Sequence, residues 1–222
     1  MVEAIIISGG NIQRGFALDF LEEKIKKSKE KPLLIAADHG LDFFKGTELV
    51  PDIAIGDFDS LTEEGLKYME QIPNMEIIRL RPDKDDSDTQ SAVNLAMQRG
   101  IKKISLLGAT GTRLDHVMAN FGLLAYGIEK GISIEIVDPN NRICVIKSGT
   151  ILKKAEGFGK YVSFFPLGEK VQGLSLKGFK YELENYDLKA SDSGLTVSNE
   201  FQDETAEVTY QSGLLLMIMS GD

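Results

Sequence analysis

The chain has 222 residues, of which 42% are hydrophobic and 27% charged, which is typical of a globular protein with one large or two small domains. Its 25 basic and 34 acidic side chains give a formal charge of −9, which argues against general nucleic-acid binding because that requires a basic face. The sequence shows no secretory signal and no membrane-spanning run, so we expect a cytoplasmic protein. The only cysteine, Cys144, excludes an intrachain disulfide and a thiolate metal cluster, and its apolar neighbours predict a core position.

The first part of the chain alternates short apolar runs with segments of helical spacing. Strands are predicted at 4–8, 33–37, 53–55, 75–80 and 103–107, and the alternation of strands and helices continues to about Asp138. Helices are predicted through 16–25, at 41–45 and 62–71, from Asp86 or Ser87 to Gly100, and from about 113 to Gly131. This alternation predicts an α/β domain with a doubly wound, mostly parallel sheet.

The segment PDIAIGDFDSL, residues 51–61, carries two carboxylates directly after a predicted strand that ends at Gly56. In an extended segment, Asp57 and Asp59 point to the same side, and two neighbouring anions favour a bound cation. Ligands of open α/β sheets gather beyond the carboxyl ends of the strands. We therefore predict a magnesium-holding loop here, with an ordinary acidic turn as the alternative.

Other strand ends carry similar chemistry. Asp38 follows the second strand, and four acids surround Lys84 before the next helix, namely Asp83, Asp85, Asp86 and Asp88. Helix capping explains one or two of these acids, and four exceed that need. A lysine among them is the expected companion where phosphate oxygens and a metal share a site.

Glycine-rich loops follow two of the predicted strands. Gly9 and Gly10 follow the first strand, and paired glycines allow the backbone to approach a ligand closely. Gly108, Thr110 and Gly111 lie between a strand and a helix N-terminus, which is a common phosphate cradle. Arg113 is placed to contact phosphate, with Asp115 in the first turn beside it. The structural alternative is a tight turn followed by an N-terminal acid.

Together, the carboxylates, the basic residues and the glycine loop suggest magnesium-assisted work on a polyphosphate. The sequence lacks the P-loop, GxSxG, HExxH and HxxEH patterns, and it offers no convincing nucleophile pair. Direct in-line transfer to an acceptor hydroxyl is therefore the simplest scheme. His116 is interpreted as a packed or capping residue, with a base or phosphate contact as the alternative, and His39 as a loop residue.

After Pro139 the pattern changes to short runs rich in β-branched and large apolar residues. Strands are predicted at 142–147, 150–154, 160–166, 173–176, 195–199, 206–210 and 214–219. This pattern predicts an all-β domain, a sandwich or roll, and gives domains of 1–139 and 140–222. Its core is predicted to contain the aromatic residues Phe158, Phe164, Phe165, Phe179, Tyr181 and Tyr186.

Five segments together resemble the thiamine pyrophosphokinase family. They are Asp38 after a strand, PDIAIGDFDSL, DKDDSDTQSA, GATGTRLDHVMAN and the late VSNEF, in the family's order and spacing over nearly the whole chain. The resemblance implies a Rossmann-like α/β domain followed by a β-sandwich. It also implies Mg²⁺-dependent transfer of the diphosphoryl unit of ATP to the hydroxyl of thiamine, giving thiamine diphosphate and AMP. The family works as a homodimer with thiamine bound between subunits.

The resemblance also assigns residues. By position, Asp38, Asp57, Asp59, Asp88 and Asp115 match the family's acidic, magnesium-linked positions. Lys84 and Arg113 match its polyphosphate-contacting positions, and Ser198 and Asn199 match the motif that meets the aminopyrimidine of thiamine. A serine–asparagine pair offers the donors and acceptors that such an edge requires.

The chain departs from the family pattern at several positions. His39 stands in place of a usual glycine, Ala109 and Thr112 replace two others, Gln90 stands where Glu is common, and Ser87 replaces Thr. None of these changes removes a proposed ligand. Two rival functions remain: a pyrophosphokinase acting on another hydroxymethyl heterocycle such as a pterin, and a binding module that senses a nucleotide or thiamine without turnover.

Overall fold

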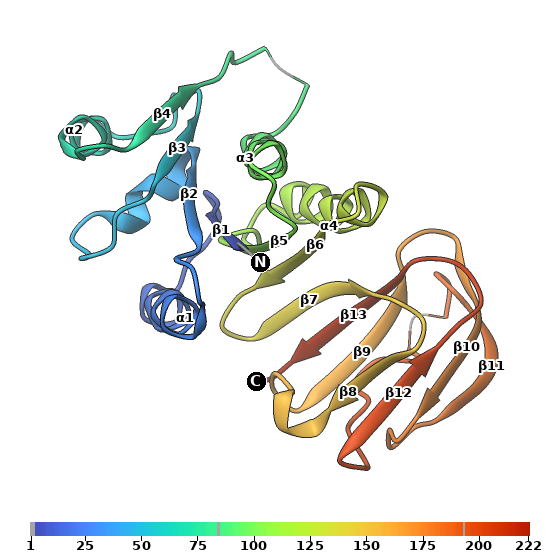
Figure 1. Cartoon of the computed structure of the whole chain (residues 1–222). Helices are drawn as coiled ribbons and strands as arrows, with labels where there is room; N and C mark the ends of the chain where they lie inside the picture. The colour runs from blue at the N-terminus through green and yellow to red at the C-terminus, as the bar shows by residue number, and fades with distance from the viewer. Residues whose placement is uncertain (1–2, 84, 193) are drawn as a thin grey trace. The chain divides into compact units, whose positions relative to one another are not determined.

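The computed structural model describes residues 3–83, 85–192 and 194–222. The chain divides into two compact units, Met1–Pro139 and Asn140–Asp222 (Figure 1). The first unit alternates strands and helices, and the second consists almost entirely of strands. Each unit is described by itself below.

The first unit contains a parallel sheet in the order β4-β3-β2-β1-β5-β6. Its strands are β1 (Glu3–Ile7), β2 (Leu33–Ala37), β3 (Ile53–Gly56), β4 (Glu76–Arg79), β5 (Lys103–Leu107) and β6 (Ser133–Val137). The central strands are almost fully buried, as expected for parallel strands covered on both faces. The prediction of a mostly parallel α/β sheet is confirmed.

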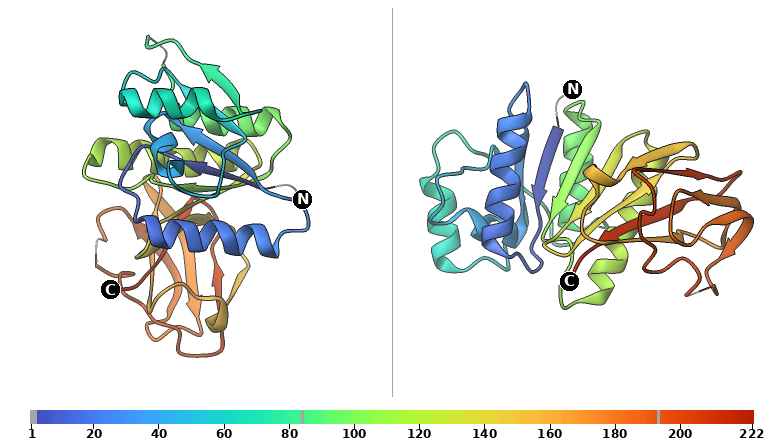
Figure 2. Two further views of the ribbon diagram at one scale, coloured as in Figure 1. Left: turned by 90° about the vertical axis from the view of Figure 1, so that its left-hand side faces the viewer. Right: turned by 90° about the horizontal axis from the view of Figure 1, so that it is seen from below.

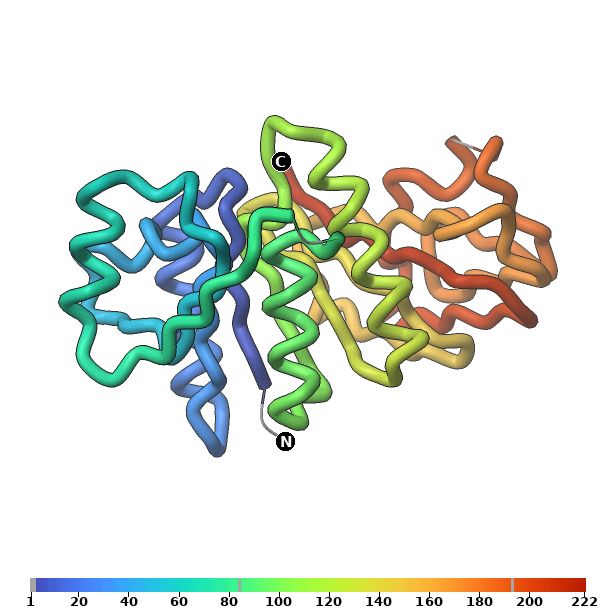
Figure 3. The backbone as a smooth tube through the Cα atoms, turned by 90° about the horizontal axis from the view of Figure 1, so that it is seen from above, coloured from blue at the N-terminus to red at the C-terminus, as the bar shows by residue number. Residues whose placement is uncertain are grey.

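Helices connect these strands and cover the sheet. They are α1 (Arg14–Lys27), α2 (Glu63–Gln71), α3 (Asp88–Gln98) and α4 (Leu114–Glu129), with a 3₁₀ helix, η1, at Asp38–Phe44. Figure 2 (right) shows α1 on one face of the sheet, and Figure 3 shows α3 and α4 over the opposite face. Among the described residues, no helix is both long and apolar enough to span a bilayer.

The ends of α3 are set by local sequence. The Ser87 side chain caps the N-terminus by accepting a hydrogen bond from the Gln90 backbone N–H at 3.1 Å. At the other end, Gly100 has φ +80° and its N–H donates to the Met97 carbonyl, while the Ile101 N–H donates to Ala96. This is the glycine-terminated ending that the sequence predicts.

A partly buried ionic cluster fastens α1 to the sheet. Lys24 Nζ lies 2.7 Å from Glu3 Oε1 of β1 and 3.1 Å from Glu135 Oε1 of β6. The fully buried Ser105 hydroxyl of β5 lies 3.1 Å and 2.7 Å from the same two carboxylate oxygens. Because these side chains are only 11–19% exposed, their charges depend on one another for stabilisation.

The second unit contains antiparallel strands in the orders β7-β13-β9 and β11-β10-β12-β8. Their bounds are β7 (Asn141–Ile146), β8 (Thr150–Lys153), β9 (Tyr161–Pro166), β10 (Lys170–Lys177), β11 (Leu183–Lys189), β12 (Thr205–Thr209) and β13 (Leu215–Ser220), with a short 3₁₀ helix, η2, at Lys154–Glu156. Side chains from both orders form one core around Phe164 and Phe179, whose rings meet edge-on at 5.4 Å. The prediction that this part of the chain is built from strands is confirmed.

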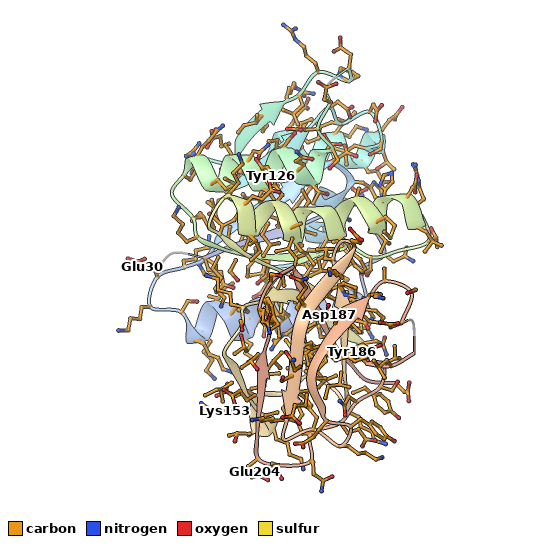
Figure 4. All side chains as sticks on the ribbon, turned by 90° about the vertical axis from the view of Figure 1, so that its right-hand side faces the viewer. Glu30, Tyr126, Lys153, Tyr186, Asp187 and Glu204 are labelled. Atoms are coloured by element: carbon orange, nitrogen blue, oxygen red, sulfur yellow. The ribbon has the colours of Figure 1, made fainter. Side chains whose placement is uncertain are left out.

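Several predictions for the second unit are wrong. Residues 195–199 form turns, with Asn199 in an isolated bridge to Val162, whereas the strand β11 went unpredicted. Tyr181 and Tyr186 are 57% and 38% exposed rather than part of the core, and Figure 4 labels Tyr186 on β11. Cys144 is only partly buried, although it packs against the core.

Candidate active site

Parallel pairing places the carboxyl ends of β1, β2, β3 and β5 at one edge of the first unit's sheet. The loops that leave these strands carry nearly all the predicted site residues of this unit. Lys84, which is predicted to contact polyphosphate, lies outside the described residues. The remaining residues can be followed loop by loop.

Asp38 begins η1 in a left-handed conformation, with φ +47°, which costs energy for a non-glycine residue. Its Oδ2 accepts a hydrogen bond from the Ser60 hydroxyl. Its Oδ1 is buried and has no hydrogen-bond partner among the described residues. A Cβ on Gly56 would lie 3.0 Å from the Asp38 Cα, so Gly56 permits the close approach of the two loops.

The chain turns at Phe58 and is not extended between Asp57 and Asp59. The prediction that an extended backbone points the two side chains to the same side is therefore wrong. Phe58 between them has φ +61° and is only 4% exposed. The Asp59 backbone N–H donates to Asp57 Oδ1 at 3.2 Å. Burial of the Phe58 ring therefore folds the chain so that both carboxylates stay on the outside.

The negative charges of Asp38, Asp57 and Asp88, which follow three different strands, all act on the Asp59 carboxylate. The pKa of Asp59 is raised, first by the negative charge of Asp57, then by desolvation, and also by Asp38 and Asp88. Like charges raise a carboxyl pKa in this way because they disfavour its ionised form. The structure thus brings Asp38, Asp57 and Asp88 within electrostatic range of Asp59, whereas Asp86 and Asp115 have other partners.

The described residues contain no group of three or more His, Cys, Asp or Glu side chains close enough to hold a metal ion by themselves. Mg²⁺ does not need such a cage, because it usually keeps several waters and binds one or two carboxylates together with substrate phosphates. Hard carboxylate oxygens, including the buried Oδ1 of Asp38, suit that cation. The donor set fits a magnesium ion shared with a phosphate ligand.

The two glycine loops pack against each other through their backbones. The Gly10 N–H donates to the Gly108 carbonyl at 2.8 Å, and the Asn11 N–H donates to Thr110 at 3.2 Å. A Cβ on Gly10 would lie 2.3 Å from the Gly108 oxygen. Gly10 is therefore required by the neighbouring loop, and its N–H is not free for phosphate as the pattern suggests. Gly9 is exposed beside it.

Further contacts fix the second loop, and sequence reasoning missed them. The Thr110 hydroxyl donates to Asp138 Oδ2 at 3.0 Å, and the buried Asn120 amide donates to the Ala109 carbonyl at 2.7 Å. A Cβ on Gly111 would lie 3.2 Å from the Asn11 nitrogen. The supporting polar residues come from the position directly after β6 and from α4, which sequence spacing alone does not connect to this loop.

Arg113 and Asp115 form an exposed ion pair at the start of α4. Arg113 Nη2 lies 2.7 Å from Asp115 Oδ2. This hydrogen bond is the main reason that the pKa of Asp115 falls to about 2. The His116 backbone N–H also donates to Asp115, at 3.0 Å. Asp115 is thus ionised and oriented by its own segment.

In the second unit, Ser198 and Asn199 differ sharply in environment. Ser198 is exposed with φ +55°, its N–H donates to Ser163 Oγ at 3.0 Å, and its hydroxyl has no hydrogen-bond partner among the described residues. Asn199 is only 2% exposed. Its amide accepts from the Tyr181 and Glu200 N–H groups and donates to the Tyr181 carbonyl at 2.7 Å. Asn199 therefore shapes the segment that displays Ser198.

An α/β unit with clustered carboxylates at the carboxyl edge of its strands defines a candidate nucleotide- or phosphate-handling enzyme. Comparison of the chain with known protein families and structures narrows this class. Residues 25–136 match the family model described as "Thiamin pyrophosphokinase, catalytic domain", and residues 149–215 match "Thiamin pyrophosphokinase, vitamin B1 binding domain".

Relatives agree over the whole chain. The thiamine pyrophosphokinase of Bacillus subtilis is 30% identical over 213 residues, which is 96% of this chain and 98% of that protein. Its crystal structure matches with a TM-score of 0.84 over 99% of both chains. The thiamin pyrophosphokinase structure from Geobacillus thermodenitrificans matches with a TM-score of 0.80 at 30% identity, over 100% of this chain and 98% of that one. The yeast enzyme, 17% identical over 99% of this chain and 86% of that one, shares the fold with a TM-score of 0.81.

The chain belongs to the thiamine pyrophosphokinase family, a family of kinases. The resemblance drawn from the five sequence segments is therefore confirmed.

Proposed function

We propose that the chain transfers the diphosphoryl group of ATP to the hydroxyl of thiamine, giving thiamine diphosphate and AMP. The hydroxyl oxygen bonds to the β-phosphorus, the bond from that phosphorus to the α,β-bridging oxygen breaks, and the hydroxyl proton passes to a carboxylate. Family membership supports the substrates. The observation that carries the chemistry is the meeting of Asp38, Asp57, Asp59 and Asp88.

In this proposal, Asp57, Asp59 and Asp88 hold Mg²⁺, which neutralises developing charge on the polyphosphate when bound. Asp115 holds Arg113 at the N-terminus of α4, where the guanidinium can contact phosphate.

The ATP-binding residues proposed are Gly9, Asp38, Lys84, Gly108, Thr110, Gly111 and Arg113, with Gly10 supporting them through its backbone hydrogen bond to Gly108. The first unit, residues 1–139, is proposed as the nucleotide-binding and catalytic domain with a Rossmann-like fold. Residues 140–222 are proposed as a β-sandwich that binds thiamine through Ser198, with Asn199 supporting it. A cytoplasmic homodimer is the proposed form of the protein.

Mass spectrometry after incubation with ATP, Mg²⁺ and thiamine tests the reaction. We expect AMP and thiamine diphosphate in equal amounts. AMP formed only with another hydroxymethyl heterocycle would instead support the pterin-type enzyme. Retained thiamine binding without AMP would support a sensor, although a binding module has little need for so many mutually repelling carboxylates.

Ser198→Ala is expected to raise the thiamine KM about fivefold while leaving kcat nearly unchanged. The substitution removes one exposed hydroxyl that, in this proposal, contacts the aminopyrimidine of thiamine and not the hydroxyl that receives the diphosphoryl group. Steady-state kinetics with thiamine as the varied substrate provide the measurement. Ser212→Ala, at an exposed serine between β12 and β13, is the matched control. An unchanged thiamine KM in Ser198→Ala would remove this residue from the proposed site.

A further inference from the structure

Two acids at the start of α3, Asp86 before the helix and Asp88 in its first turn, are held in different ways. Asp88 is among the carboxylates whose charge acts on Asp59. Asp86 instead accepts a hydrogen bond at 3.0 Å from the Asn94 side-chain amide, which lies farther along α3. Asp86 is partly buried, whereas Asp83 and Asp85 are exposed. The loop is therefore folded back onto its own helix through Asp86.

The Asn94 amide is in turn fixed from α4. The Tyr126 hydroxyl donates to Asn94 Oδ1 at 2.8 Å, which leaves the amide nitrogen facing Asp86. Lys130 Nζ lies 5.3 Å from the centroid of the Tyr126 ring. Figure 4 labels Tyr126, which belongs to α4. Three partly buried side chains thus form one continuous connection from α4 to the acidic loop.

A second contact anchors the same helix start from the opposite side. The Thr89 hydroxyl donates to Ser8 Oγ at 3.0 Å, and Ser8, directly after β1, is only 2% exposed. Asp88 stands between Thr89 and the Asp86 anchor in the chain. Its backbone is therefore held toward β1 on one side and toward α4 on the other.

We propose that Tyr126 and Asn94 are positioning residues that hold Asp86, and through it the Asp88 carboxylate, where the magnesium-bound triphosphate is taken up. This inference rests on the proposed function. In this assignment the Asp86 carboxylate is an anchor and not a metal ligand. Loss of the Tyr126 hydroxyl lets the Asn94 amide rotate, so Asp86 loses its donor and the start of α3 loosens.

Tyr126→Phe tests the connection by removing one oxygen atom. We expect the KM for Mg·ATP to rise about threefold to tenfold, as for the loss of one hydrogen bond, while the thiamine KM stays unchanged. Tyr210→Phe is the matched control, because its hydroxyl donates to the Ile146 carbonyl at 2.8 Å in the second unit. A purely structural role for Tyr126 would give both variants the same small loss of stability and no change in KM, which would overturn the proposal.

Two substitutions at Asp86 distinguish a residue that anchors the loop by a hydrogen bond from one that binds the metal. Asp86→Asn keeps a side-chain oxygen that can accept from Asn94, so we expect a nearly unchanged KM for Mg·ATP. Asp86→Ala is expected to behave like Tyr126→Phe, and the double variant is expected to be no worse than Asp86→Ala because both changes break one connection. An equal rise in the KM for Mg·ATP in Asp86→Asn and Asp86→Ala would show that the negative charge is needed. That result would overturn the assignment of Asp86 as an anchor.

A measurement without turnover keeps this inference separate from the proposed function. Hydrogen exchange of the Gln90 and Ser91 backbone amides, which donate to Ser87 at the start of α3, is expected to be about threefold to tenfold faster in Tyr126→Phe than in wild type or Tyr210→Phe. Unchanged exchange would overturn the connection. A wild-type protein that makes no thiamine diphosphate would refute the proposed function alone, and the exchange rates would still decide the role of Tyr126.

Discussion

Asp59→Asn is expected to reduce turnover below about one-hundredth of wild type while leaving the melting temperature unchanged or raised. Even residues that only support a metal ligand cost about 10-fold to 100-fold when they are lost, and a direct ligand is expected to cost more. The stability effect runs the other way, because Asp57, Asp38 and Asp88 raise the pKa of Asp59. Ionised Asp59 therefore destabilises the fold at neutral pH, and the neutral amide relieves that repulsion.

Turnover and thermal unfolding of the same preparation provide the test. Asp19→Asn is the control, since Asp19 is an exposed acid on α1, away from the loops of the candidate site. It should match wild type in both measurements. Near-normal turnover in Asp59→Asn together with a clearly lower melting temperature would show that Asp59 is a structural residue and would refute the proposed magnesium site.

Lys24→Met is expected to lower the free energy of unfolding by about 3 kcal/mol, the lower end of the range for breaking a buried ion pair. The substitution removes the Lys24 cation from the partly buried carboxylates of Glu3 and Glu135 beside Ser105, while Lys103 stays 3.5 Å from Glu3. Urea denaturation measures the change as a lower transition midpoint at an unchanged slope. Lys27→Met is the control on the same helix, because its pair with Glu23 is exposed and should contribute less than about 0.5 kcal/mol. A Lys24→Met variant as stable as Lys27→Met would contradict this account.

The same cluster predicts a pH dependence. Burial disfavours the charge on Lys24, yet Glu135 and Glu3 outweigh it and raise the pKa of Lys24 above its ordinary value. A raised lysine pKa gives stability that is fully present below the ordinary value, about 10.4, and is lost as the pH rises through the folded value. The difference in stability between wild type and Lys24→Met should therefore be constant from about pH 7 to 9 and shrink above about pH 10.

Sequence periodicity predicts the first unit well because its parallel strands are continuous apolar runs bounded by glycines and caps. The second unit is harder. Strand β11 has the sequence LENYDLK with four consecutive exposed residues, so it lacks an apolar signal and is held by pairing with β10. Residues 195–199 carry the opposite signal, and the positive φ of Ser198 and the buried amide of Asn199 turn them away from a strand.

The candidate site is likewise predicted only in part from the sequence. Carboxylates at strand ends predict a cluster because parallel strands share an edge, and that reasoning needs only the strand order. It does not reveal that Asp86 and Asp88 have different partners, since Asn94 and Tyr126 reach the loop through the packing of α3 and α4. The turn at Phe58 and the Thr110–Asp138 contact likewise depend on tertiary packing.

The backbone contact between Gly10 and Gly108 gives the first unit an internal probe. The Gly10 amide proton is bonded to the other loop rather than to its own, so its chemical shift and exchange rate report the distance between the ends of β1 and β5. Glycine amide signals occupy a distinct region of nuclear magnetic resonance spectra. A titration with nucleotide followed at this one resonance would show whether the two loops respond as a single rigid piece or separately.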